Sequence, residues 1–385
     1  VSAQYAVFSE LGWGSTTMQT RIPAVMMRGG TSKGLYFLAS DLPPDVVTRD
    51  KVLLAAMGSP DTRQIDGMGG ADPLTSKVAI VSSSSMDGVD VDYLFAQVVI
   101  EEARVDTAPN CGNMLAGVVA FAIEQGIVKA DDGETTLRIH MVNSGNLCDQ
   151  TVQTPGRQVT YDGAARIDGA PGTAAPVMIN FLDLAGSACG SLLPTGNVID
   201  DVDGVTVTCI DNGMPVVLIA ASDLGATGYE TRDEMNADTE LKARIEAIRL
   251  KIGPKMNLGD VTDKVVPKMC LVAPPIAGGA IHTRCFIPHV CHASIGVLAA
   301  VTVATACVIP GTSVDGIAVP GDGNLIAVEH PMGEFTVELE VEGPPEALEL
   351  KRAALLRTTR RLFEGNVLIP AGVWDGRQNL SQAAE

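Results

Sequence analysis

The chain has 385 residues, of which 46% are hydrophobic and only 4% aromatic, and its formal net charge is −19. This length and composition exclude an intrinsically disordered chain and are typical of a globular enzyme of two or three domains with an aliphatic core. The negative charge argues against nucleic acid or an anionic membrane as a partner, because both bind concentrated positive charge. A small anionic substrate stays compatible, since local N–H groups and a few basic side chains are enough to hold it.

The N-terminal segment and the cysteines suggest where the protein works. Residues 1–17 lack a basic segment and a continuous apolar core, so we expect no secretory signal and a natural start near Met18. The cysteines follow no repeating spacing, in a chain too large to need disulfide staples, so we expect reduced thiols and a cytoplasmic protein. The eight cysteines are Cys111, Cys148, Cys189, Cys209, Cys270, Cys285, Cys291 and Cys307.

Helices and strands alternate in the first half of the chain. An amphipathic helix is expected at residues 45–57, where apolar residues recur at helical spacing. Residues 35–38 and 78–81 are short apolar runs that predict strands. Residues 93–105 begin with alternating apolar and polar side chains and predict an extended segment, and the apolar run 114–123 predicts a buried helix.

The second half follows a loop-rich stretch of low charge, residues 151–190, which contains the expected domain boundary. Amphipathic helices are expected at 237–252 and 345–362. The apolar run 293–310 is at the short edge of a membrane span, and its counterpart 114–123 is too short to cross, so both are expected to be helices buried within a fold. Alternating or β-branched patterns predict strands at 205–210, 216–221, 325–328 and 335–341.

Three short sequence echoes occur in the same order in both halves. Residues 38–42 (LASDL) recur as 220–224 (AASDL), 75–81 (TSKVAIV) as 266–272 (VPKMCLV), and 111–117 (CGNMLAG) as 292–298 (HASIGVL). Each match is short, but three in one order predict two similar halves, with a site in the cleft between them. We therefore expect an α+β fold in which each half wraps a sheet around one helix.

Lys77 and Cys111 are the leading candidates for chemistry, because they offer two proton-transfer groups on different backbone supports. Cys111 lies between the extended segment and the apolar helix, where free N–H groups and the helix dipole favour an anion. Lys77 begins a predicted strand, and a partly desolvated amine there can act as a base. The residues alone leave open a plainer interpretation, in which Cys111 is a small buried side chain and Lys77 a solvated strand end.

Two other motifs suggest different chemistry. Residues 30–34 (GTSKG) match the G-x-S-x-G pattern, but a strand rather than a helix is expected after them, which disfavours a nucleophile elbow. The same turn is better suited to presenting N–H and hydroxyl donors to a carboxylate, with an ordinary hairpin as the alternative. His282, His289 and His292, with Cys285 and Cys291 among them, match no standard zinc spacing, so no metal site is expected.

Ordered motifs along the chain carry a family resemblance. They are IP at 22–23, MRGGTSKG at 27–34, GSPD at 58–61, QIDG at 64–67, GADPLTSK at 70–77, NCGN at 110–113 and LPTGN at 193–197. With them the chain, from about residue 21 to about residue 375, resembles the PrpF family, which contains isomerases of methylaconitate, methylitaconate and 4-oxalomesaconate. The motifs VTCIDNGMPVV at 207–217, KMNLGD at 255–260, PKMC at 267–270, IPH at 287–289 and CHASIG at 291–296 are most similar to the 4-oxalomesaconate branch.

The resemblance implies a diaminopimelate-epimerase-like α+β fold with two pseudo-symmetric domains, each a curled β-sheet or barrel around a central helix. The first domain would span residues 21–187 and the second 188–375, with the last segment free to pack back on the first, an N-terminal extension at 1–20 and a tail at 376–385. Epimerase relatives use one cysteine from each half, but here the second position falls near Ser294, with Cys291 close in sequence. Two-cysteine epimerisation is therefore not expected, and the family pattern places the chemistry on Lys77 and Cys111.

The expected activity is a cofactor-independent 1,3-proton shift, with Lys77 as base and Cys111 as acid or as the group that orients the reacting carbon. The resemblance implies keto–enol tautomerisation of 4-oxalomesaconate in gallate or protocatechuate degradation. The nearest alternative is an allylic double-bond isomerase of 4-oxalomesaconate, methylaconitate or methylitaconate, and a second is a non-catalytic polycarboxylate-binding protein. The expected partner is a small polycarboxylate substrate, and a homodimer is left open. Its carboxylates and carbonyl would be bound by residues from Arg28, Gly30, Thr31, Ser32, Ser76, Asn110, Gly112, Asn113, Lys268 and Ser294.

Overall fold

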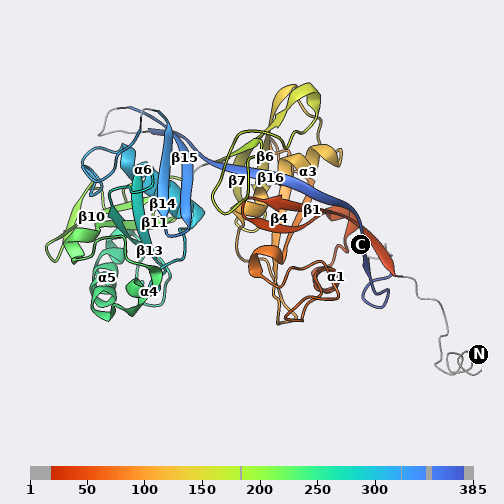
Figure 1. The fold of residues 1–385 in the computed structure, drawn as a ribbon, viewed down its shortest axis with the longest axis horizontal. Helices are drawn as coiled ribbons and strands as arrows, with labels where there is room; N and C mark the ends of the chain where they lie inside the picture. The colour runs from red at the N-terminus through yellow and green to blue at the C-terminus, as the bar shows by residue number, and fades with distance from the viewer. Residues whose placement is uncertain (1–18, 183, 322, 344–348, 377–385) are drawn as a thin grey trace, which may run out of the picture.

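Two lobes of similar topology lie side by side in the computed structural model, which describes residues 19–182, 184–321, 323–343 and 349–376 (Figure 1). The expected N-terminal extension and C-terminal tail lie almost entirely outside the described residues. One long strand, β16 (Glu349–Ile369), runs through both lobes and joins them. The described strands form one sheet in the order β1-β2-β3-β4-β6-β7-β8-β16-β15-β14-β13-β12-β11-β10-β9.

The first lobe is a closed barrel around a buried helix. β16 pairs with β8 through residues 354–358 and with β1 through residues 359–369, so the sheet returns to its first strand. The barrel encloses α2 (Gly112–Leu115) and α3 (Val118–Glu124), and the latter is apolar along almost its whole length. The strands are β1 (Thr20–Gly29), β2 (Ser32–Leu38), β3 (Lys77–Ser83), β4 (Val91–Val98), β5 (Val105–Asp106), β6 (Gly133–Met141), β7 (Asn146–Thr154) and β8 (Pro176–Phe181).

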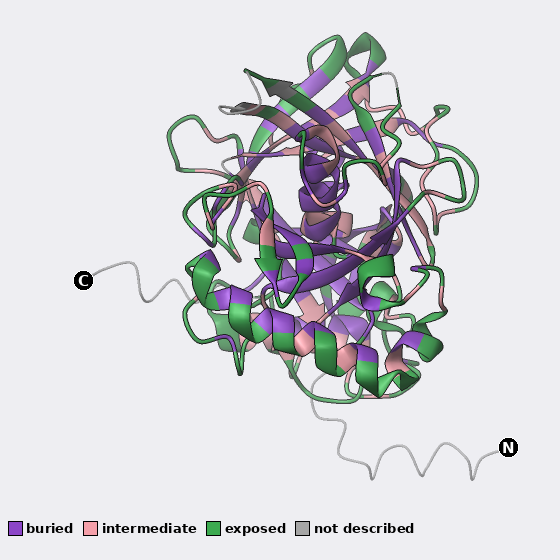
Figure 2. Cartoon of the chain, turned by 90° about the vertical axis from the view of Figure 1, so that its left-hand side faces the viewer, coloured by how far each residue is buried: buried purple, intermediate pink, exposed green. Residues whose placement is uncertain are grey.

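The second lobe wraps its strands around α6 (Val297–Val308), whose central residues are fully buried. The hydroxyls of Thr302 and Thr305 donate to the carbonyls of Leu298 and Val301, at 3.0 and 2.8 Å, so these polar side chains are satisfied inside the core. Seen from this lobe's side, the buried helix lies inside the strands (Figure 2). The strands are β9 (Asp200–Val202), β10 (Val205–Asp211), β11 (Pro215–Ala220), β12 (Lys268–Ala273), β13 (Ile281–Phe286), β14 (Leu325–His330) and β15 (Gly333–Glu342).

Amphipathic helices cover the outer face of each sheet. In the first lobe, α1 (Val46–Met57) begins where the Asp45 side chain accepts the N–H of Thr48 at 2.8 Å, and it ends at Gly58 in the left-handed conformation. In the second lobe, α4 (Arg232–Ala237) precedes α5 (Thr239–Ile252), which is capped by Asp238. The predictions of helices at 45–57 and 237–252 are therefore confirmed, apart from an earlier break before Thr239.

The predicted duplication is confirmed strand by strand. In the first lobe β2 is parallel to β3 and β4 to β6, with the central helices between β4 and β6. In the second lobe β11 is parallel to β12 and β13 to β14, with α6 between β13 and β14. The three sequence echoes fall on matching elements, since Lys77 and Lys268 are the first residues of β3 and β12. The exact domain boundary at residues 187 and 188 stays a prediction.

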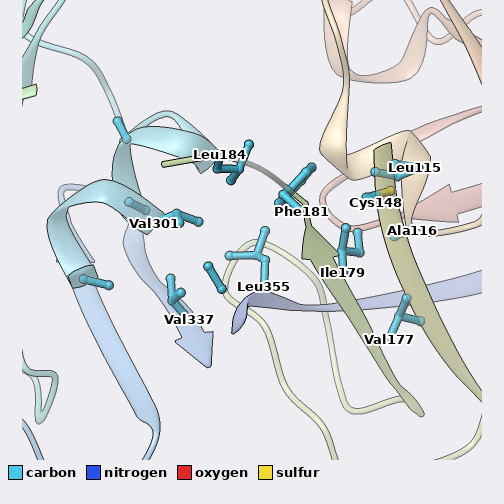
Figure 3. Close-up of a cluster of buried hydrophobic side chains, with 14 of the residues drawn as sticks. Leu115, Ala116, Cys148, Val177, Ile179, Phe181, Leu184, Val301, Val337 and Leu355 are labelled. Carbon is cyan, nitrogen blue, oxygen red and sulfur yellow. The ribbon is translucent and has the colours of Figure 1, made fainter. Parts of the chain in front are cut away.

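One hydrophobic cluster spans both lobes, and each lobe has a further cluster between its sheet and its outer helices. Side chains around α3 and side chains around α6 belong to the same buried cluster. In the described part of the chain, no helix is long and apolar enough to cross a membrane. Figure 3 shows residues that connect the two sides, including Ile179, Phe181, Leu184, Val301, Val337 and Leu355.

The helix predicted at 345–362 is wrong in the part that the structure describes. Residues 349–369 form strand β16, because this segment supplies the last strand of one lobe and the closing strand of the other. Leucine, alanine and arginine favour a helix only weakly, and the pairing available on both sides overrides that preference. One further expectation needs correction, since the extended segment predicted at 93–105 is interrupted between β4 and β5. The loop-rich stretch 151–190 includes strand β8.

Candidate active site

Lys77 is held by the strand next to its own. It begins β3, its register partner on β4 is Gln97, and its amine donates to the Gln97 Oε1 at 2.7 Å. The same Nζ lies 5.0 Å from the centroid of the Phe95 ring, within the range of a cation–π contact. Only 9% of the residue is exposed. The amine is therefore fixed in position and largely shielded from water, as a proton-transfer group requires.

Cys111 occupies the predicted corner between strand and helix. It is the N-cap residue of α2, with extended backbone angles, and its carbonyl accepts the N–H of Leu115 at 3.0 Å. The Tyr93 hydroxyl donates to the same carbonyl at 3.1 Å. Tyr93 and Phe95 lie two residues apart on β4 and therefore point to the same, inner face. Lys77 and Cys111 thus contact one row of side chains inside the first barrel.

The turn between β1 and β2 lies against the first turn of α2. The Asn113 side chain donates to the hydroxyls of Thr31 and Ser32, at 3.0 and 3.4 Å. A Cβ on Gly30 would lie 2.2 Å from the Asn113 Oδ1, and Gly30 has a φ of 54°, so glycine is required there. The Arg28 guanidinium donates to the Gly30 carbonyl at 2.7 Å. Since Ser32 begins strand β2, this turn is not a nucleophile elbow.

The second lobe contributes groups that face the same boundary. Lys268 is 9% exposed, and burial lowers the pKa of its amine. The Ser294 hydroxyl lies 3.2 Å from the His330 Nδ1, and its N–H donates to the His292 Nδ1 at 2.8 Å. A Cβ on Gly112 would lie 3.7 Å from the Val297 side chain, so the first turns of α2 and α6 meet where the lobes join.

Two predicted binding residues have other surroundings. The Ser76 side chain is fully buried, and its hydroxyl donates to the Gln64 Oε1 at 2.8 Å and to the Asp72 carbonyl at 2.9 Å. These bonds fix the loop before Lys77. Asn110 is exposed one residue before Cys111. The binding roles of both residues stay predictions.

A cavity of about 610 Å³ opens between the lobes. The first lobe contributes the loop Arg166 to Asp168, the second contributes β13 and the turn after β14, and β16 contributes Arg357. Asp168 also links the lobes, because its Oδ2 accepts the N–H of Glu334 at 2.8 Å. Neither Lys77 nor Cys111 is among the lining residues. Arg357 connects the cavity with Cys111, because it lines the cavity and lies near Cys111. Burial lowers the pKa of Arg357 to about 9, and Cys111 opposes this shift.

Sequence reasoning missed most of the residues that line this cavity. Arg357 stood in a segment predicted to be helical, and its local sequence carries no signal of the site. His282 was considered as a metal ligand or, alternatively, as a loop residue near the cleft; it lines the cavity, but from strand β13 rather than from a loop. The other lining residues missed were Arg166, Asp168, Arg284, Glu329, His330 and Glu334.

A buried polar network holds the wall of the cavity. The His282 Nε2 lies 2.5 Å from the Arg284 Nη1, and since arginine can only donate, the ring nitrogen accepts. The His282 Nδ1–H then donates to Glu329, at 2.9 Å, and the ring is neutral. Burial lowers the pKa of His282, in agreement with this assignment. Within the described residues, no group of three or more His, Cys, Asp or Glu side chains is arranged to hold a metal ion.

Comparisons with known proteins agree along nearly the whole chain. A family model described as PrpF protein matches residues 19–370. The 4-oxalomesaconate tautomerase of Pseudomonas putida is 58% identical over 360 residues, which cover 93% of this chain and 99% of that protein. The (4E)-oxalomesaconate Delta-isomerase of Novosphingobium sp. (strain KA1) is 59% identical over 349 residues, covering 90% and 97%.

A solved structure agrees with the fold. The crystal structure of a methylitaconate-delta-isomerase superposes with a TM-score of 0.84 at 38% identity, over 92% of this chain and 97% of that one. Fold, sequence motifs and overall identity therefore lead to one assignment. The chain is an isomerase and belongs to the PrpF family.

Proposed function

We propose that this protein catalyses a cofactor-independent 1,3-proton shift in 4-oxalomesaconate, with keto–enol tautomerisation as the reaction. The observation that carries the proposal is that Lys77 and Cys111 contact neighbouring inward-facing side chains of β4, Lys77 through its amine over the Phe95 ring and Cys111 through its backbone carbonyl at the Tyr93 hydroxyl. The names and high identities of the two curated relatives support the choice of substrate.

The reaction needs one base, one acid and donors for a developing negative charge. A C–H beside a ketone and a conjugated alkene is acidic because the anion formed is a delocalised dienolate. Lys77, fixed by Gln97, is the group that removes this proton, and Cys111 returns a proton or orients the reacting carbon. Delivery of the proton to oxygen or to carbon then selects the enol or the keto form.

The carboxylates of the substrate need donors from both lobes. The turn residues Gly30 to Ser32, together with Asn113, present N–H and hydroxyl groups beside Cys111. Lys268 and Ser294 face the same boundary from the second lobe. A substrate held by both lobes bridges the interface, so its reacting carbon is kept away from bulk water.

Allylic isomerisation is the second candidate, because the relative that is 59% identical is named a Delta-isomerase. The first step is the same removal of a proton to give the delocalised anion. The two reactions differ only in the atom that receives the proton afterwards. Return of the proton to the far carbon moves the double bond instead of changing the keto and enol forms.

A solvent-exchange experiment tests the proposal. Purified protein is mixed with 4-oxalomesaconate in D₂O, and proton NMR follows deuterium entry and the position of the double bond, with the spontaneous rate subtracted. Tautomerisation predicts exchange at the carbon beside the ketone with the alkene unmoved, whereas allylic isomerisation predicts a moved alkene. Absence of protein-dependent change in either signal would remove both candidates.

We also propose that the protein works in the cytoplasm, in the degradation of gallate or protocatechuate. All eight cysteines, each within the described residues, are free thiols, which fits a reducing compartment. Fractionation of the source cells, with the protein followed by antibody, tests the location. Recovery in a secreted fraction would contradict it.

A further inference from the structure

Arg357 is a deeply buried charged side chain at the boundary between the lobes. It lies on β16 opposite Val177 of β8, and only 2% of the residue is exposed. Its guanidinium carbon lies 4.3 Å from the centroid of the Phe335 ring, and its Nη1 donates to the Leu356 carbonyl at 2.9 Å. Its Nε and Nη2 are buried, and neither has a hydrogen-bond partner among the residues that the structure describes.

The unpartnered edge of Arg357 is the edge that arginine uses to bind carboxylates. Elsewhere in this chain, Arg138 binds the two oxygens of Asp149 through Nε and Nη2, at 2.8 and 3.0 Å. Arg249 binds Glu246 through the same two nitrogens, at 2.7 Å each. This side-on pair of donors matches the spacing of two carboxylate oxygens. Arg357 has the donors but no protein carboxylate opposite them.

Leaving such a group unpaired is costly. A buried charged donor without a partner loses its hydration and gains nothing in exchange, which is among the larger destabilising effects in a folded protein. Burial lowers the pKa of Arg357 to about 9, an expression of the same cost. Positions that break such a local rule are concentrated at functional sites. The guanidinium therefore needs an acceptor that the protein does not supply.

The acidic side chains that line the cavity, Asp168, Glu329 and Glu334, each accept hydrogen bonds from other groups, and none of them bonds to the Nε or Nη2 of Arg357; Glu334 accepts the Thr336 hydroxyl at 3.3 Å. Glu329 accepts the N–H groups of Ile276, Ala277 and Gly279, at 2.7 to 2.9 Å, together with His282. The Asp168 Oδ2 accepts the N–H of Glu334. Arg357 thus keeps two unpaired donors, and the cavity of about 610 Å³ that it lines has room for a small acid.

We propose that Arg357 is the anchor for one carboxylate of the substrate, which it binds side-on through Nε and Nη2 from the cavity between the lobes. Both nitrogens are shielded from solvent in this structure, so side-on binding requires a rotation of the guanidinium that exposes this edge to the cavity. The inference rests on the proposed function and adds to it the residue that selects a polycarboxylate. Cys111 lies close enough to affect the pKa of Arg357, so the anchored end is held near the reacting groups.

The test compares Arg357→Met with Arg352→Met, since Arg352 lies on the same strand but has a side chain that is 38% exposed and forms an ion pair with Glu338 at 3.0 Å. Calorimetry measures the Kd of tricarballylate, a saturated tricarboxylate that cannot react, and kinetics give KM and kcat for 4-oxalomesaconate. For Arg357→Met we expect Kd and KM to rise about 10- to 100-fold, as for loss of a charged hydrogen-bonded pair, with kcat changed much less. Arg352→Met should leave all three within about twofold.

Thermal stability separates anchoring from a structural role. Because Arg357→Met removes an unpaired buried charge and keeps an apolar contact with Phe335, its Tm should stay equal or rise. A lower Tm with unchanged Kd and KM would overturn the inference. If this variant does not fold, Arg357→Lys decides, because it keeps the charge but loses the two parallel donors. Wild-type affinity for tricarballylate must then exceed that of Arg357→Lys, and equal affinities would overturn the inference.

The two proposals can fail separately. A wild-type protein that turns over 4-oxalomesaconate, with Arg357→Met equal to it in KM and Kd, would refute only the anchor. A wild-type protein that leaves 4-oxalomesaconate unchanged but binds tricarballylate through Arg357 would refute only the isomerase reaction.

Discussion

The two lobes share a backbone plan but equip it with different chemistry. In each lobe, one of the two equivalent strands β3 and β12 begins with a buried lysine, Lys77 in the first lobe and Lys268 in the second. Lys77 has an amide opposite it and an aromatic ring beside it, whereas Lys268 has the thiol of Cys285 as a neighbour and no register partner on β13. The repeated fold therefore fixes where an amine stands, and the neighbouring strand decides what the amine can do.

The central helices differ in the same way. The first lobe breaks its helix into α2 and α3 at Gly117, where a Cβ would lie 2.5 Å from the Tyr36 hydroxyl. That hydroxyl donates to the Met114 carbonyl inside the break, while Tyr93 donates to the carbonyl of Cys111. The second lobe has one continuous helix, α6, with Gly296 at its N-cap. Two tyrosines thus hold the turn that carries the thiol, and the second lobe has no thiol at the matching N-cap.

The largest effect is expected from substitution of Lys77, the lysine of the first lobe. Lys77→Met should lower kcat at least about 10³-fold while leaving the fold and substrate binding nearly intact, because a positioned base contributes on this scale. Stopped-flow measurement of 4-oxalomesaconate turnover, with circular dichroism to check folding, provides the test. Activity near that of wild type would remove Lys77 from the mechanism and leave the lobes chemically equivalent.

Cys111→Ala should have the next largest effect. Loss of a positioned acid or base is expected to lower the rate at least about 10²-fold. Cys307→Ala is the matched control, because Cys307 is also half-buried but lies near the far end of α6. If the two variants lose the same modest amount of activity, Cys111 serves packing, and the first lobe supplies only the amine.

Much of the duplication could be predicted from the sequence, because it depends on local patterns. The lysine at a strand start, the thiol at a helix N-cap and the glycine-rich turn each have a short signature that their neighbours define. The helix predicted at 345–362 failed for a different reason. Strand β16 is determined by partners more than 150 residues away, such as β1 and β8, and its own composition carries no trace of them.

The cavity between the lobes was hidden from sequence reasoning for the same physical reason. Arg166 and Asp168 come from a loop, Glu329 and His330 from the end of β14, and Arg357 from β16. These side chains meet only after both lobes have folded and joined. A buried unpaired arginine can be recognised only from three-dimensional contacts, because its sequence context, two leucines before it and two threonines after it, is that of an ordinary strand.

A smaller effect is expected at the second lysine. Lys268→Met should raise KM for 4-oxalomesaconate about 10-fold with kcat within about threefold, since losing one charged hydrogen bond weakens binding of a carboxylate without removing the base. Steady-state kinetics beside Lys77→Met give the comparison directly. A loss in kcat as large as that of Lys77→Met would mean that both lysines take part in proton transfer.

The smallest effect concerns pH and again belongs to the second lobe. Burial lowers the pKa of His330 from 6.5 to about 4 in the folded protein, with Asp168 opposing the shift and His292 and Arg357 adding to it. Between these two values the unfolded chain binds a proton that the folded protein excludes, so stability falls as the pH falls below 6.5. From pH 7.5 to pH 6, this group should cost about 1 kcal/mol of unfolding free energy. Urea unfolding of wild type and His330→Gln at both pH values measures the difference, since every other titrating group is present in both. An equal loss in the two proteins would mean that His330 is charged in the fold, and the cavity wall would then carry one more positive charge beside Arg357.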